Sequence, residues 1–275
     1  MKHKVIILGA GYEKTCSFGK GASNGPKKVI ECFNEQVESY DRFSKSNLLN
    51  FLEIRSKQIE NIKDLDPKEM IEAVKNEYEK NKEFTILIGG EHTVSLGPLI
   101  AISKKFKSND ITIVQIDAHL DLRDTDEDFN PIPFGKYHHS TVMRRAHELG
   151  FNLVPIGIRL YSESELDYAK KNNIKIFEWN RITPKIHEII SSILTKKVYL
   201  TIDVDGIDPC HMPGTGTPVQ GGLEWYYTIE LIQEIFKNKE VIGADITEVA
   251  PQENNSLTEF GAAQLCHIII ANKFK

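Results

Sequence analysis

The sequence predicts an α/β fold built on a largely parallel sheet. Short runs of β-branched and apolar residues alternate with longer segments of helical periodicity along the whole chain. Most of these runs are predominantly apolar, as are strands covered on both faces in a parallel sheet. The chain has 275 residues, 40% of them hydrophobic and 27% charged, so it has enough apolar material for a sizeable core.

Seven runs have the length and composition of buried strands. In chain order they are residues 4–8, 84–88, 111–116, 153–158, 175–177, 198–202 and 241–246. Helical segments lie between them, which is typical of βα units.

Two of the helical segments carry clear start signals. A helix is predicted over residues 67–80, because Asp66 can cap it and Pro67 suits its first position. A second is predicted over residues 162–171, where Ser162 and Glu165 form a capping box.

Two stretches, residues 121–136 and 210–222, are too long for routine connections between strands and helices. Long loops of this kind usually carry function. Periodic segments resume on both sides of each, and neither looks like a linker. We therefore expect one domain over residues 1–275.

Charge and composition exclude several classes of function. The formal net charge of −5 gives no basic surface for a nucleic acid, and no apolar stretch is long enough to cross a membrane. No signal peptide is expected in the first residues, because Gly9 ends their apolar run early. The four cysteines are widely spaced and form no C-x-x-C pair, which favours a reduced cytoplasmic protein.

Gly9 and Gly11 follow the first predicted strand and begin like a dinucleotide-binding turn. The third glycine of that motif is missing, because Lys14 occupies its place. A tight turn that needs glycine is the better interpretation.

Acidic residues and histidines follow three other predicted strands, at the edge where α/β sheets place ligands. Residues with side chains of this kind are His92 after the second strand, Asp117, His119 and Asp121 after the third, and Asp203 and Asp205 after the sixth. If the extended backbone continues, residues two apart share a face, so each group of side chains would converge. Any one of these segments alone could be a capped turn.

Four carboxylates and two imidazoles without a thiolate suit hard or borderline divalent ions, Mn²⁺ above all. Two such ions balance the four negative charges. A pair of this kind can activate water for hydrolysis. The sequence therefore predicts a metal-dependent hydrolase.

These motifs resemble those of the ureohydrolase family of arginases and agmatinases. The segments that carry the likeness are residues 12–26, the G-G-E-H-T box at 89–93, the D-A-H-L-D box at 117–121, the segment with paired arginines at 137–145, the T-I-D-V-D-G-I-D-P box at 201–209, the loop at 213–223 and D-I-T-E-V at 245–249. The resemblance implies a three-layer αβα fold with a mostly parallel eight-stranded sheet, two Mn²⁺ ions and assembly as a homo-oligomeric trimer or hexamer. It also implies hydrolysis of a small guanidino substrate to urea and an amine.

The resemblance also implies residue roles. The metal ligands would be His92, Asp117, His119, Asp121, Asp203 and Asp205, with Asp121 and Asp205 or their neighbours bridging the ions, which also makes Asp121 catalytic. Glu248 would hold the guanidinium through paired hydrogen bonds. His139 matches the proton-shuttle histidine through its spacing to Thr141, and His138 is the competing choice.

The sequence departs from the family pattern beside His92. Glu91 replaces the usual aspartate and Thr93 the usual serine, which can reset the surroundings of that ligand. Ser140 stands where glycine is common.

The loop at 121–136 carries Asp124, Asp126, Glu127 and Asp128 against Arg123 and Lys136. A net acidic rim would favour dicationic agmatine over guanidino acids. The expected reaction is therefore agmatine hydrolysis to putrescine and urea. The alternatives are another guanidino substrate, namely arginine, guanidinobutyrate, guanidinopropionate or formiminoglutamate, or a metal-binding protein without catalysis.

Overall fold

A computed structural model of the chain describes residues 2–128, 130 and 133–275. Phe129, Pro131 and Ile132, which belong to the predicted long loop, lie outside the described residues. Within the described part, no helix combines the length and apolar character needed to cross a membrane.

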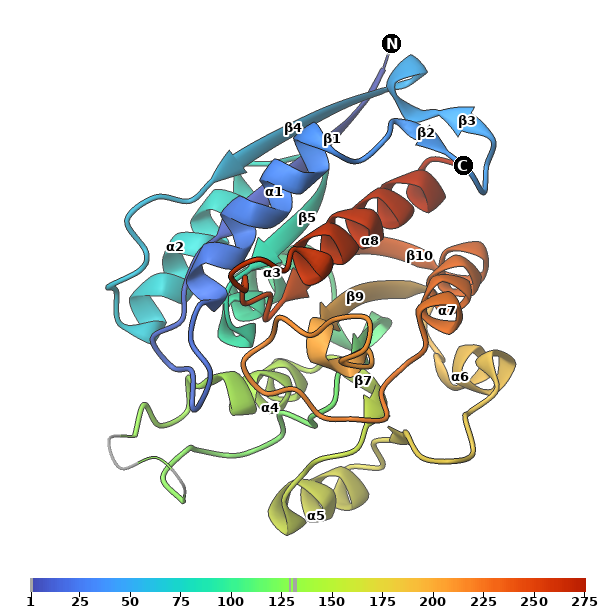
Figure 1. Cartoon of the computed structure of the whole chain (residues 1–275). Helices are drawn as coiled ribbons and strands as arrows, with labels where there is room; N and C mark the ends of the chain where they lie inside the picture. The colour runs from blue at the N-terminus through green and yellow to red at the C-terminus, as the bar shows by residue number, and fades with distance from the viewer. Residues whose placement is uncertain (1, 129, 131–132) are drawn as a thin grey trace.

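The centre of the molecule is an eight-stranded sheet in which all recorded neighbours run parallel (Figure 1). Across the sheet, the strands are β4 (Leu52–Gln58), β1 (His3–Ala10), β5 (Phe84–Gly89), β10 (Glu240–Thr247), β9 (Lys197–Asp203), β6 (Ile111–Ile116), β7 (Asn152–Ile158) and β8 (Phe177–Glu178). The predicted eight-stranded parallel sheet is thus confirmed.

Helices cover both faces of the sheet. One buried cluster packs against α1 (Gly25–Glu35), α6 (Ile186–Ser192), α7 (Trp225–Asn238) and α8 (Leu257–Lys273). The other packs against α2 (Pro67–Glu79), α3 (Leu96–Lys105), α4 (Val142–Glu148) and α5 (Glu163–Lys171). These two cores on opposite faces make the three-layer αβα arrangement.

Both predicted helix starts are confirmed. Asp66 and Glu69 form a capping box at the start of α2, with Pro67 in the first turn. At α5, the Ser162 hydroxyl accepts the backbone N–H of Glu165, while the Glu165 carboxylate accepts the backbone N–H of Ser162.

Sequence reasoning missed one strand of the sheet and misplaced another. β4 pairs only with β1, and Leu52 is its single buried residue, so it lacks the apolar pattern of the central strands. The strand expected over residues 175–177 begins only at Phe177 and has two residues. A separate small antiparallel pair joins β2 (Tyr40–Asp41) to β3 (Ser46–Asn47).

Candidate metal centre

The four central strands β5, β10, β9 and β6 deliver the predicted site residues to one edge of the sheet. His92 lies just beyond β5, Asp117 directly follows β6, Asp203 ends β9 and Glu248 directly follows β10. Because the carboxyl ends of parallel strands meet at a single edge, residues separated by more than 150 positions come together.

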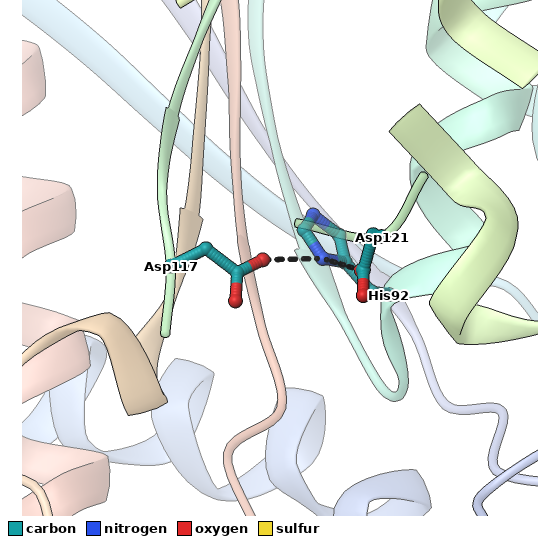
Figure 2. Close-up of side chains that lie close together, drawn as sticks. All are labelled: His92, Asp117 and Asp121. Atoms are coloured by element: carbon teal, nitrogen blue, oxygen red, sulfur yellow. Dashed lines mark hydrogen bonds and ion pairs between the residues drawn. The ribbon is translucent and has the colours of Figure 1, made fainter. Parts of the chain in front are cut away.

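One group of side chains that could hold a metal ion consists of His92, Asp117 and Asp121 (Figure 2). The Nδ1 atom of His92 lies 3.1 Å from an Asp121 oxygen, 3.3 Å from an Asp117 oxygen and 3.6 Å from an Asp203 oxygen. His92 and Asp117 are fully buried, and Asp121 is 4% exposed.

A second group contains His119. Its Nδ1 atom lies 3.1 Å from an Asp205 oxygen and 3.6 Å from an Asp117 oxygen. Asp117 therefore belongs to both groups, whereas Asp121 and Asp205 each belong to one. The carboxylate common to both groups is that of Asp117, and the expectation that Asp121 and Asp205 or their neighbours bridge the ions stays a prediction.

The backbone reaches this arrangement by turns rather than by continued strand. Asp121 has a φ of 54°, so its side chain does not converge through the extended conformation assumed from the sequence. Asp205 lies within the short 3-10 helix Val204–Gly206, where its backbone N–H donates to the carboxylate of the capping Asp203 at 2.9 Å. Glycine at position 206 lets this turn approach the backbone of Asp117 closely, because a Cβ there would lie 2.5 Å from the Asp117 nitrogen.

The chemistry of the cluster fits divalent cations. Burial and the neighbouring Asp117 carboxylate raise the pKa of Asp121 to about 7. Burial and the carboxylates of Asp205 and Asp117 likewise raise the pKa of Asp203 well above its usual range. Without cations, the carboxylates of Asp121 and Asp203 would have to take up protons near neutral pH. Two divalent ions would remove the electrostatic free-energy cost of keeping these carboxylates ionised.

A hydrogen-bonded chain orients the His92 ring. Thr201 and Asp245 are register partners on β9 and β10, and the Thr201 hydroxyl donates to Asp245 at 2.5 Å. The same hydroxyl lies 2.8 Å from His92 Nε2, so it accepts the Nε2–H. The Nδ1 lone pair then faces the carboxylates, and a divalent cation bound between them would satisfy both.

Replacing Thr201 with Val should weaken metal binding about 10–100-fold, because the hydroxyl that sets the His92 tautomer is lost at nearly constant volume. Manganese titration of the chelated protein measures this. Thr201→Ser keeps the hydroxyl and should bind metal like the wild type. Equal affinity for Thr201→Val would show that the hydroxyl does not orient His92.

Glu248 lies directly after the C-terminal end of β10, beside both groups of candidate metal ligands. Its backbone has a φ of 65°, its N–H donates to the Gly90 carbonyl at 2.8 Å, and its carboxylate accepts the His92 N–H at 2.9 Å. Burial and the carboxylates of Glu91 and Asp205 raise its pKa well above the usual value. A cationic group bound beside Glu248 would relieve this repulsion.

The two adjacent histidines have different environments. His138 is fully buried, with Nδ1 2.9 Å from the Ser140 hydroxyl and Nε2 3.8 Å from Asp126. His139 is only partly buried, and its ring lies 4.2 Å from that of His138. Burial and the rings of His138, His119 and His92 lower the pKa of His139 well below its ordinary value.

Ion pairs and backbone hydrogen bonds offset much of the negative charge of the loop at 121–136. Asp124 pairs with Arg145 at 2.8 Å, and Asp128 pairs with Arg123. Asp126 is fully buried and accepts the backbone N–H groups of residues 134 and 135 at 2.9 and 2.7 Å. Glu127 remains exposed. The argument for an acidic rim is correspondingly weakened.

The fold is a parallel three-layer α/β fold with imidazoles and buried carboxylates at the carboxyl edge of its central strands, an arrangement suited to a metal-dependent hydrolase. The model of the arginase family matches residues 3–271. The chain belongs to the arginase family and is a hydrolase of carbon–nitrogen bonds.

Named relatives indicate which members of the arginase family this chain resembles. The chain is 37% identical over 276 residues to an N(1)-aminopropylagmatine ureohydrolase of Synechocystis sp., covering 96% of this chain and 87% of that protein. It is 32% identical over 256 residues to the agmatinase of Bacillus subtilis, covering 91% and 85%. The crystal structure of agmatine ureohydrolase from Thermoplasma volcanium superposes with a TM-score of 0.83 at 26% identity, covering 99% of this chain and 90% of that one.

Proposed function

We propose that the protein hydrolyses the guanidino group of agmatine to putrescine and urea with two Mn²⁺ ions. The observation that carries this proposal is the position of the Glu248 carboxylate, beside two groups of candidate metal ligands that share the buried Asp117. A site that holds both divalent ions and an additional buried acid suits a cationic substrate attacked by water.

The ions would be held by the predicted ligands, divided into two groups by the geometry. One group is His92, Asp117 and Asp121, the other is Asp117, His119 and Asp205, and Asp203 lies beside His92. Bound there, the ions supply Lewis acidity and lower the pKa of water enough for hydrolysis at neutral pH. The donor set of oxygen and imidazole nitrogen supports Mn²⁺ over a structural zinc site.

Glu248 would bind and orient the guanidinium. A carboxylate and a guanidinium form two parallel hydrogen bonds, which fix the plane of the substrate as well as its position. Glu248 itself is held by the His92 N–H and the Gly90 carbonyl, so the substrate would be oriented relative to the backbone of a metal ligand.

His139 is our choice for the group that protonates the leaving amine. It is the more accessible of the two histidines, whereas His138 is buried and caps the short helix His139–Thr141. A shuttle has to exchange protons with both the site and solvent, which a fully buried ring does poorly.

The names of two relatives favour a second candidate substrate, N1-aminopropylagmatine. Two of the relatives that match nearly the whole chain, from Synechocystis sp. and Thermococcus kodakarensis, are named N(1)-aminopropylagmatine ureohydrolase. That compound carries the guanidino group of agmatine with an additional aminopropyl group. Both candidate substrates carry at least two positive charges, and the release of urea from either would leave a polyamine as the second product. We also propose a cytoplasmic homo-oligomer, a trimer or hexamer, as in the family.

Urea release from a substrate panel tests this proposal. Manganese-loaded protein should act on agmatine or N1-aminopropylagmatine with a kcat/KM at least about tenfold above that for arginine or guanidinobutyrate, as expected from relatives named for those two amines. The ratio between the two amines decides which is the better substrate. A higher kcat/KM for a guanidino acid would overturn the substrate assignment.

A further inference from the structure

The loop between β1 and α1 holds the backbone of His139. Thr15 is fully buried, and its hydroxyl donates to the Glu91 carboxylate at 2.6 Å. The same hydroxyl accepts the backbone N–H of His139 at 3.3 Å. Glu91, which stands where the family usually has the shorter aspartate, thus acts through Thr15 on the segment that carries His139.

Two residues further along the same loop, Ser17 contacts the ring of His139. The Ser17 hydroxyl lies 3.1 Å from His139 Nε2. The backbone and the ring of His139 are therefore both held from one short segment, Thr15 to Ser17, which lies more than 120 positions away in the sequence.

The loop that carries Ser17 is itself braced. One Glu13 carboxylate oxygen accepts the backbone N–H groups of Gly21 and Ser23 at 2.8 and 3.1 Å. Gly19 packs against the backbone of Gly216, where a Cβ on Gly19 would lie 2.6 Å from the Gly216 Cα. Ser17 is exposed but stands on a segment anchored on both sides, so its hydroxyl can hold a partner in place.

We propose that Ser17 is a positioning residue for His139, which it holds through Nε2 in the orientation needed for proton transfer. This inference rests on the proposed function, in which His139 protonates the leaving amine. A partly exposed histidine ring has several accessible rotamers, and a hydrogen bond to a fixed hydroxyl selects one. The guanidinium is held by Glu248, which Ser17 does not touch, so Ser17 acts on kcat rather than on KM.

Ser17→Ala should lower kcat about fivefold with little change in KM, the effect of losing one hydrogen bond between neutral groups. Ser17→Thr keeps the hydroxyl and should restore kcat. The matched control is Ser140→Ala, which removes a serine hydroxyl 2.9 Å from the other histidine, His138, and should leave kcat unchanged.

A double-mutant cycle separates positioning from a structural effect. In a His139→Asn background, Ser17→Ala should cause no further loss, because the group it positions is already absent. If the losses of kcat caused by Ser17→Ala and His139→Asn multiplied in the double mutant, the proposal would be overturned. A Ser17→Ala enzyme with the kcat of the wild type would also overturn it.

Histidine ring NMR makes the test independent of activity. Ser17→Ala should shift the ring resonances of His139, whereas Ser140→Ala should shift those of His138. A His139 resonance unaffected by Ser17→Ala would overturn the contact itself. A shifted resonance in a protein inactive on every guanidino compound would retain the contact and instead defeat the proposed function.

Discussion

Asp121→Asn should reduce urea release by more than about 100-fold. The Asp121 carboxylate lies 3.1 Å from His92 Nδ1 in the first group of ligands, and asparagine supplies an oxygen without the charge. Changes in the partners of metal ligands already cost about 10–100-fold, so loss of a ligand's own charge should cost at least as much. Manganese content and urea release on agmatine, measured on the same preparation, show whether metal and activity are lost together.

The matched control for this substitution is Asp124→Asn on the same loop. Asp124 pairs with Arg145 near the surface and lies outside both groups of ligands, so the same chemical change there should alter activity less than about twofold. An Asp121→Asn protein that folds, loses its manganese and still releases urea at the rate of the wild type would contradict the metal-dependent mechanism.

Glu248→Gln should lower kcat/KM for agmatine about 100-fold. Glutamine keeps an oxygen that can accept the His92 N–H, but it cannot form two charge-assisted hydrogen bonds with a guanidinium. Two such bonds at about 1.5 kcal/mol each correspond to about 3 kcal/mol, or roughly 100-fold in rate. Steady-state kinetics on agmatine over a wide concentration range measures the loss.

Manganese affinity distinguishes this effect from that of Asp121→Asn. Glu248 belongs to neither group of ligands, so Glu248→Gln should retain its manganese. Glu253→Gln, at an exposed position beyond β10, supplies the control for the same chemical change. Unchanged kcat/KM in Glu248→Gln would show that the guanidinium is held elsewhere.

The sequence was sufficient for the fold class and for the set of residues that meet at the site. Asp117 directly follows β6 and Asp203 ends β9, and both strands are almost entirely buried, so their placement at the carboxyl edge follows from the parallel sheet alone. Strand order was not predictable, because it depends on which helices pack on which face. The Thr201–Asp245 pair, which orients His92, forms only because β9 and β10 are neighbours in register.

Local backbone geometry accounts for most of the remaining differences. The left-handed turn at Asp121 brings its carboxylate to His92 in place of the extended backbone that the sequence predicted, and no alternation pattern shows such a turn. Charges in the loop at 121–136 could be counted from the sequence, but their pairing with Arg145 and Arg123 could not. β4 was missed because an edge strand buries little and needs no apolar pattern.

The most direct test of the central claim is urea release from agmatine and arginine by the protein loaded with manganese, compared with the same protein after chelation. We predict urea from agmatine, little from arginine, about two Mn²⁺ per chain in the active sample, and loss of activity on chelation with recovery when manganese is restored. Urea release that persists after complete removal of metal, or tight binding of manganese with no urea from any guanidino compound, would contradict the account.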